Sequence, residues 1–92
     1  MTIAKRTDEK ITLDGHAGNK IVCAMVSSLC VSTKKYIEDI LEEKNHFDLK
    51  SGKFIINMAG FSAPALLLVE SFWYGIKGIS HDYPDNIKVY GM

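Results

Sequence analysis

The sequence predicts an α+β fold, in which a small and mostly antiparallel sheet of about four to five strands carries two helices on one face. Short segments alternate polar and apolar residues with the period of two that half-buried strands show, whereas two longer segments repeat their apolar residues at helical spacing. The predicted order is strand, strand, helix, strand, strand, helix, strand. Two amphipathic helices against one side of such a sheet bury both kinds of apolar face in two layers.

Two strands are predicted at the start of the chain, in segments 1–6 and 10–14. In the second of these, Ile11 and Leu13 share one face and polar residues occupy the other, as in a strand with one buried side. Gly15 ends this strand.

The first helix is predicted to begin at Lys20, with Asn19 as its N-cap. Apolar residues then follow helical spacing, and we expect the helix to end near Glu43 or Lys44, before a polar stretch.

Segments 47–50 and 53–58 surround Ser51-Gly52, which predicts a hairpin. Ser62 can cap a second helix, and Pro64 suits its first turn.

The second helix is expected to weaken at Gly75 and Gly78, because glycine is a poor helix former. We then expect a loop at 81–85 and a last strand at 87–90.

Composition narrows the class of protein. The 92 residues form one domain, 1–92, and the 11 basic and 11 acidic residues balance, so there is no electrostatic reason to expect nucleic acid or an anionic membrane as a partner. The longest apolar run, 63–69, is interrupted by Pro64 and is too short to span a bilayer. Residues 1–6 lack the apolar core of a signal peptide. We therefore expect a cytoplasmic protein.

The two cysteines, Cys23 and Cys30, are expected on the same helix. Seven helical residues separate their Cα atoms by roughly 10 Å, which is too far for a disulfide, and free thiols suit a reducing compartment. Neither belongs to a C-x-x-C motif, so we expect no metal site, and no cofactor is implied. Cys30 is expected to be a small core residue.

Cys23 is a candidate nucleophile. It lies about one turn into the predicted helix, where unpaired amides and the positive end of the helix dipole favour a thiolate. Lys20, three residues earlier, adds positive charge. Because free cysteine is among the most buried residue types, a simple packing role for Cys23 is the alternative.

His16 is the candidate base. Gly15 and Gly18 permit positive φ angles, so a mobile loop can bring the imidazole back to the sulfur of Cys23. The ordinary alternative is an exposed loop histidine.

The motif pair G-H-A-G at 15–18 and I-V-C-A-M-V-S at 21–27 resembles the ribosomal-processing cysteine protease family (Prp, also called the YsxB-like family). The order of elements agrees over the whole chain, and the end of the chain, Y-P at 83–84 followed by I-K-V at 87–89, is similar to the closing strand of that family. The resemblance implies a cysteine endopeptidase of firmicute-type bacteria or their phages, with His16 and Cys23 as the catalytic dyad.

The resemblance also implies a substrate and an assembly. Family members remove a short N-terminal extension, apolar and aromatic before the cut, from large-subunit ribosomal protein twenty-seven, and some act on phage capsid or scaffold proteins. They tend to be homodimers.

The chain departs from the family at two points. Many members have an acidic residue where this chain has Lys20, and the loop before it is shorter than in many members. Asp14, on the same strand face as His16, is a candidate substitute, with a solvated turn residue as the alternative. Ser27 matches the family's serine, although a backbone hydrogen bond one turn back explains it equally well.

The expected mechanism uses helix N-terminal amides around Val22 and Cys23 to bind the oxyanion. Two other functions remain open at this point. One is a non-catalytic, dimeric peptide-binding module of the same fold, and the other is a thiol redox sensor that uses Cys23.

Two further groups of side chains stand out. Phe72, Trp73 and Tyr74 are adjacent and cannot all face one core, so one of them is a candidate for a dimer contact or a substrate groove. His46 and His81 are expected in loops, exposed to solvent.

Overall fold

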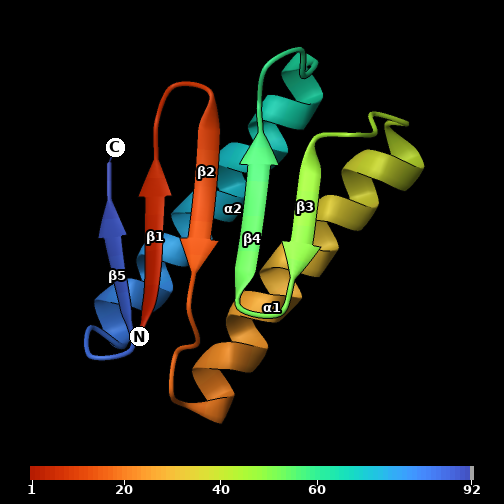
Figure 1. The fold of residues 1–92 in the computed structure, drawn as a ribbon. Helices are drawn as coiled ribbons and strands as arrows, with labels where there is room; N and C mark the ends of the chain where they lie inside the picture. Colours follow the sequence, from red (N-terminus) through yellow and green to blue (C-terminus); the bar gives the residue numbers. More distant parts are fainter. Residues whose placement is uncertain (92) are drawn as a thin grey trace.

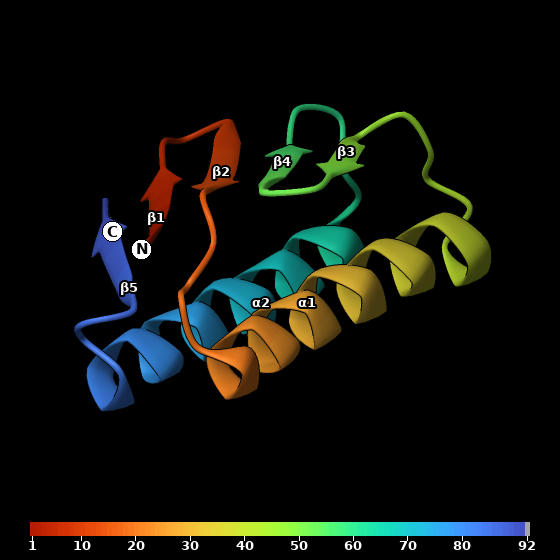
Figure 2. The same cartoon turned by 60° about the horizontal axis from the view of Figure 1, so that its bottom comes forward.

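The computed structural model describes residues 1–91 and shows a five-stranded open sheet with two long helices (Figure 1). The elements are β1 (Thr2–Arg6), β2 (Lys10–Asp14), α1 (Lys20–Lys35), η1 (Tyr36–Ile40), β3 (Phe47–Lys50), β4 (Lys53–Asn57), α2 (Ala63–Asp82) and β5 (Ile87–Tyr90). Both helices lie on the same face of the sheet (Figure 2). The predicted α+β class, element order and layering are confirmed.

The strands are arranged in the order β3-β4-β2-β1-β5. All neighbours are antiparallel except β1 and β5, which are parallel. Helix α2 connects β4 to β5. Strand β3 is therefore one free edge of the sheet, and its hairpin with β4 turns at Ser51-Gly52 as the sequence predicts. Strand β4 ends at Asn57, one residue before the predicted end.

The core fills the space between the sheet and the helices. Its fully buried side chains come from four strands and from all the helical segments, including Ile11, Ile56, Val22, Phe72 and Ile76. Within residues 1–91, no helix has the length and apolar character that crossing a membrane requires.

The aromatic triplet of α2 divides between core and surface. Phe72 and Trp73 are buried, whereas 78% of Tyr74 is exposed. Successive helical residues are about 100° apart, so only two of the three can face inward.

The first helix ends differently from the prediction, which placed its end near Glu43 or Lys44. The α-helical part stops at Lys35 and continues as a π-helix over Tyr36–Ile40. Glu42 then adopts a positive φ of 58°, a conformation that cannot continue a right-handed helix. This reversal returns the chain from the helix layer to the start of β3.

The second helix is longer than predicted, because it continues through His81 to Asp82, where a loop was expected. It runs without a break through Gly75 and Gly78. A side chain at Gly75 would lie 3.1 Å from Leu29 Cδ1, so this glycine allows α1 and α2 to pack closely. The packing compensates for the low helix propensity of glycine.

Glu43 links the end of the first helical segment to the start of α2. Its carboxylate accepts hydrogen bonds from the Ser62 backbone N–H at 2.8 Å and from the Ser62 hydroxyl at 2.5 Å. Ser62 is the N-cap of α2, as predicted, and its Oγ accepts a hydrogen bond from the Ala65 N–H. These hydrogen bonds, led by that of the Ser62 hydroxyl, lower the pKa of Glu43.

We expect this link to make stability depend on pH. A carboxyl whose pKa is lower in the folded state stabilises the fold above its unfolded pKa of about 4.3, and this contribution is lost as the pH falls through the folded pKa. Urea unfolding should therefore show Glu43→Gln less stable than wild type at pH 7, with the difference shrinking towards pH 3. A difference that does not change with pH would contradict this.

Candidate active site

The loop between β2 and α1 carries the candidate base. At its start, Gly15 has a φ of +93°, and a Cβ there would lie 2.4 Å from the Met1 carbonyl oxygen, so only glycine fits. Two hydrogen bonds from other elements hold the loop: the Gly15 N–H donates to Gly52 O at 2.8 Å, and Asn86 Nδ2 donates to Ala17 O at 2.8 Å. The loop is thus bound to neighbouring elements at its first residue, Gly15, and at Ala17 near its middle.

His16 is exposed and its ring lies against the tip of the β3–β4 hairpin. A Cβ built on Gly52 would be 2.9 Å from His16 Nε2 and 3.4 Å from Cε1, so the imidazole occupies the space that a side chain would need. The His16 carbonyl accepts a hydrogen bond of 2.6 Å from the amino group of Met1. Both contacts restrict where the ring can lie.

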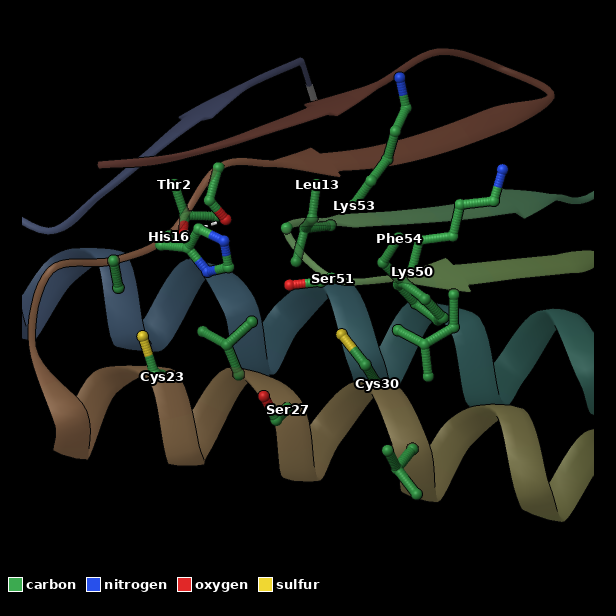
Figure 3. Close-up of a pocket in the computed structure, with 16 residues that line it drawn as sticks. Thr2, Leu13, His16, Cys23, Ser27, Cys30, Lys50, Ser51, Lys53 and Phe54 are labelled. Atoms are coloured by element: carbon green, nitrogen blue, oxygen red, sulfur yellow. Dashed lines mark hydrogen bonds between the residues drawn. The ribbon is translucent and has the colours of Figure 1, made fainter.

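Cys23 lies at the end of the first turn of α1 and is half-buried. Asn19 caps this helix as predicted, because its Oδ1 accepts from the N–H groups of Ile21 and Val22. In Figure 3 the Cys23 thiol points from α1 towards the side of the groove that carries His16. Within residues 1–91, the two side chains face the same open space without a hydrogen bond between them.

That space is a groove of about 280 Å³ between α1 and the hairpin. His16, Cys23 and Ser27 lie at or near one end of it, and Leu13, Cys30 and Phe54 lie towards the other (Figure 3). Its volume is just below the roughly 300–1,000 Å³ of typical ligand pockets. It therefore has room for a few side chains of a peptide.

The structure brings some predicted supporting residues to the groove and leaves others away from it. Gly15 and Ser27 line the groove, whereas Gly18, Lys20 and Val22 do not. Val22 is fully buried in the core, and Lys20 is exposed at the start of α1.

Asp14 also lies outside the groove lining. Its Oδ1 is 3.5 Å from Lys53 Nζ, its register partner across β2 and β4. The charge of Asp14 is therefore balanced by Lys53 instead of by His16.

The backbone amides of Val22 and Cys23, which were expected to bind the oxyanion, already donate hydrogen bonds within the helix. The Ile21 and Val22 amides donate to Asn19 Oδ1 at 2.9 and 3.2 Å, and the Cys23 amide donates to the Asn19 carbonyl at 2.9 Å. Asn19, the N-cap of the helix, thus accepts hydrogen bonds from the same amides that were expected to bind an oxyanion. The hydroxyls of Ser27 and Ser51 line the groove and are available donors there.

The hairpin tip is the part of the site that the sequence did not reveal. Lys50, Ser51, Gly52 and Lys53 all line the groove, although they are separated from Cys23 by nearly thirty residues of sequence. The sequence indicated a turn at Ser51-Gly52, but a turn motif does not indicate which other part of the chain the turn contacts.

Cys30 is buried, as predicted, and burial raises the pKa of its thiol to about 12. It is therefore protonated and unreactive at neutral pH.

The prediction that His46 is exposed to solvent was wrong. Its ring stacks on that of Phe61, with 4.1 Å between the ring centroids, and its Nδ1 lies 2.8 Å from Asn57 O. Within residues 1–91, no group of three or more His, Cys, Asp or Glu side chains is arranged to hold a metal ion.

Gly52 offers a test of how the ring is held. In Gly52→Ala, the new methyl group displaces the His16 ring, and a shift of about 1 Å in a catalytic group can cost on the order of a hundredfold in rate. Gly60→Ala is the matched control: φ is +85° against +73° at Gly52, and the nearest side-chain atom is 3.8 Å away. Both variants should lose similar stability in urea unfolding, while only Gly52→Ala loses kcat for any reaction that uses His16. Equal activity in the two would show that the ring position is not critical.

Comparison with known proteins defines the class to which this fold and groove belong. The model of a family of cysteine proteases matches residues 1–88. The chain therefore belongs to the family described as cysteine protease Prp. No curated protein sequence matches the chain.

Solved structures share the fold. The ribosomal processing protease Prp from S. aureus, in complex with a covalently linked product peptide, is 22% identical, with a TM-score of 0.81 over 98% of this chain and 97% of that one. SMU.848 from Streptococcus mutans is 24% identical, with a TM-score of 0.73 over 97% and 90%. A hypothetical protein from Staphylococcus aureus is 17% identical, with a TM-score of 0.73 over 98% and 97%.

Proposed function

We propose that this member of the family is an endopeptidase in which Cys23 is the nucleophile and His16 is the general base and acid. The observation that carries the proposal is that the half-buried thiol and the exposed imidazole face one groove from opposite sides. Cys30, the other thiol of the groove, is buried and has a raised pKa, so it is the poorer nucleophile.

In the proposed reaction, His16 takes the Cys23 proton as the sulfur attacks the scissile carbonyl carbon. The tetrahedral intermediate collapses with cleavage of the C–N bond, and the imidazolium gives its proton to the leaving amine. Water, deprotonated by His16, then hydrolyses the thioester and releases the acid. Because the helix amides are already bonded to Asn19, the Ser27 and Ser51 hydroxyls are the proposed donors to the oxyanion.

The proposed substrate is a protein with an apolar and aromatic N-terminal extension. The groove is lined by apolar side chains that suit such residues, namely Leu13, Val26, Cys30, Leu49 and Phe54. The ribosomal processing protease Prp from S. aureus has also been solved in complex with a substrate peptide. By that analogy, the candidates are bacterial large-subunit ribosomal protein twenty-seven and a phage capsid or scaffold protein, processed in the cytoplasm.

We also propose a homodimer, as the family resemblance implies. The outer face of α2 exposes Leu67 by 72% and Tyr74 by 78%, and these residues, seven positions apart, lie on the same side of the helix. Tyr74 is thus the member of the aromatic triplet that is free for such a contact.

The test is cleavage of a synthetic peptide that spans the aromatic-rich extension and the first residues of the mature protein. Mass spectrometry should find a single cut with wild type and none with Cys23→Ser or His16→Ala. Cleavage by Cys23→Ser at the wild-type rate would overturn the proposed mechanism.

A non-catalytic peptide-binding module is the second candidate, and two observations favour it. The amides expected to bind the oxyanion are occupied, and Lys20 replaces the acidic residue that many family members carry. Binding of the peptide without any cut would establish this function, and Lys20→Glu would then be the first variant to examine for restored cleavage.

A further inference from the structure

Strand β3 is a free edge of the sheet, and it borders the candidate active site. The groove is bounded on one side by α1 and on the other by residues of β3 and its turn, including Leu49 and Lys50. An edge strand carries a row of backbone N–H and C=O groups that no neighbouring strand uses. Two residues of this edge strand, Leu49 and Lys50, line the groove that also holds Cys23.

The hairpin register shows which backbone groups face outward. Asn57 N–H donates to His46 O at 2.7 Å, so His46 and Asn57 form a hydrogen-bonded pair of the ladder. Bonded and non-bonded pairs alternate in an antiparallel ladder, so the pair of Lys50 with Lys53, four positions along, is also bonded. The N–H and C=O groups of Phe47 and Leu49 therefore point away from β4, towards the free edge.

The side chain of Leu49 lies on the same side of the strand as the groove. It is 44% exposed and lines the groove, and its partner across the hairpin is the buried Phe54. Within residues 1–91, Leu49 thus joins the free edge to the groove: its backbone N–H and C=O point outward in the plane of the sheet without a partner strand, and its side chain lies on the helix-facing side, at the groove. An extended peptide needs this combination, because its backbone pairs along an edge while alternate side chains enter pockets.

We propose that the protein substrate binds as an additional strand along the free edge of β3, with the backbone N–H and C=O of Leu49 as its principal anchor. The occupant is the extended segment next to the scissile bond, since the same groove leads from Leu49 to Cys23. This inference rests on the proposed peptidase function and adds the mode of substrate recognition to it.

The protein-side test removes one backbone donor. Leu49→Pro deletes an N–H that the hairpin does not use, so the fold tolerates it at an edge. Leu49→Ala loses the same leucine side chain but keeps the N–H. We expect KM for the aromatic-rich peptide to be on the order of three- to tenfold higher in Leu49→Pro than in Leu49→Ala, the worth of one hydrogen bond, with similar kcat. Equal KM values would overturn the proposal.

Val89→Pro controls for proline at a sheet edge. Thr2 N–H donates to Asn86 O, so the backbone groups of alternate β5 residues face β1, and those of Val89 point outward at the opposite edge, away from the groove, while its side chain packs against the core. This variant should keep the wild-type KM. A rise in KM equal to that of Leu49→Pro would show a general effect of edge proline and would overturn the proposal.

The substrate-side test leaves the β3 edge unaltered and therefore does not depend on how a β3 variant folds. Single N-methyl groups are placed at successive amides of the same peptide, and binding to the inactive Cys23→Ser protein is measured by titration calorimetry. Strand addition predicts that methylation weakens binding at every second residue. Uniform losses would overturn it. A peptide that binds with the alternating pattern but is never cut by wild type would retain the β3 mode and refute the peptidase instead.

Discussion

Replacing Cys23 by serine is expected to reduce kcat/KM for the aromatic-rich peptide by at least about a thousandfold. The substitution exchanges one atom, but a hydroxyl beside an imidazole in a site built for a thiol is a far weaker nucleophile, and loss of a covalent nucleophile removes the whole reaction route. Steady-state cleavage followed by mass spectrometry measures the effect.

Cys30→Ala is the matched comparison for this variant. Cys30 lies two helical turns further along the same groove, but it is buried and its pKa is raised by that burial. We expect kcat/KM of this variant to fall by no more than roughly tenfold, because the packing of the groove changes. If Cys30→Ala lost as much activity as Cys23→Ser, the assignment of the nucleophile would be wrong.

Replacing Phe72 by alanine is expected to have the largest effect on stability. Phe72 is 2% exposed, at the centre of α2, and its ring packs 5.7 Å from that of Phe54 in β4. Truncation of a buried phenylalanine costs about 3–5 kcal/mol, which is a large part of the stability of a small domain. Thermal unfolding should show a Tm lower by more than about 10 °C.

Tyr74→Ala provides the control two residues away on the same helix. Tyr74 is 78% exposed, so its truncation removes little packing within one chain. Its Tm should stay within a few degrees of wild type at low protein concentration. A loss that matches Phe72→Ala would mean that Tyr74 is buried in solution, as in a tight dimer.

The fold was predictable because its signals are local. Alternation at Ile11 and Leu13, the caps Asn19 and Ser62, and the Ser51-Gly52 turn each act within a few residues, and all of these predictions are confirmed. The predicted helix ends were wrong, because the point at which a helix ends also depends on contacts with residues that are distant in sequence. Gly75 of α2 packs closely against Leu29 of α1, and the carboxylate of Glu43 accepts a hydrogen bond from the Ser62 N–H at the start of α2.

The site was predictable only in part, for the same reason. His16 and Cys23 were found as a motif within one stretch of sequence, and the structure places both at one groove. The hairpin tip that supports His16, and the β3 edge beside it, come from a different part of the chain. The occupied helix amides could have been foreseen, since a strong Asn19 cap necessarily uses them.

The central claim, a His16/Cys23 dyad, is tested most directly by covalent labelling with a chloromethyl ketone of the peptide that ends at the cleavage site. We predict one adduct, located on Cys23 by mass spectrometry, which forms far more slowly in His16→Ala. Labelling of Cys30, or labelling of Cys23 at the same rate with and without His16, would contradict the claim.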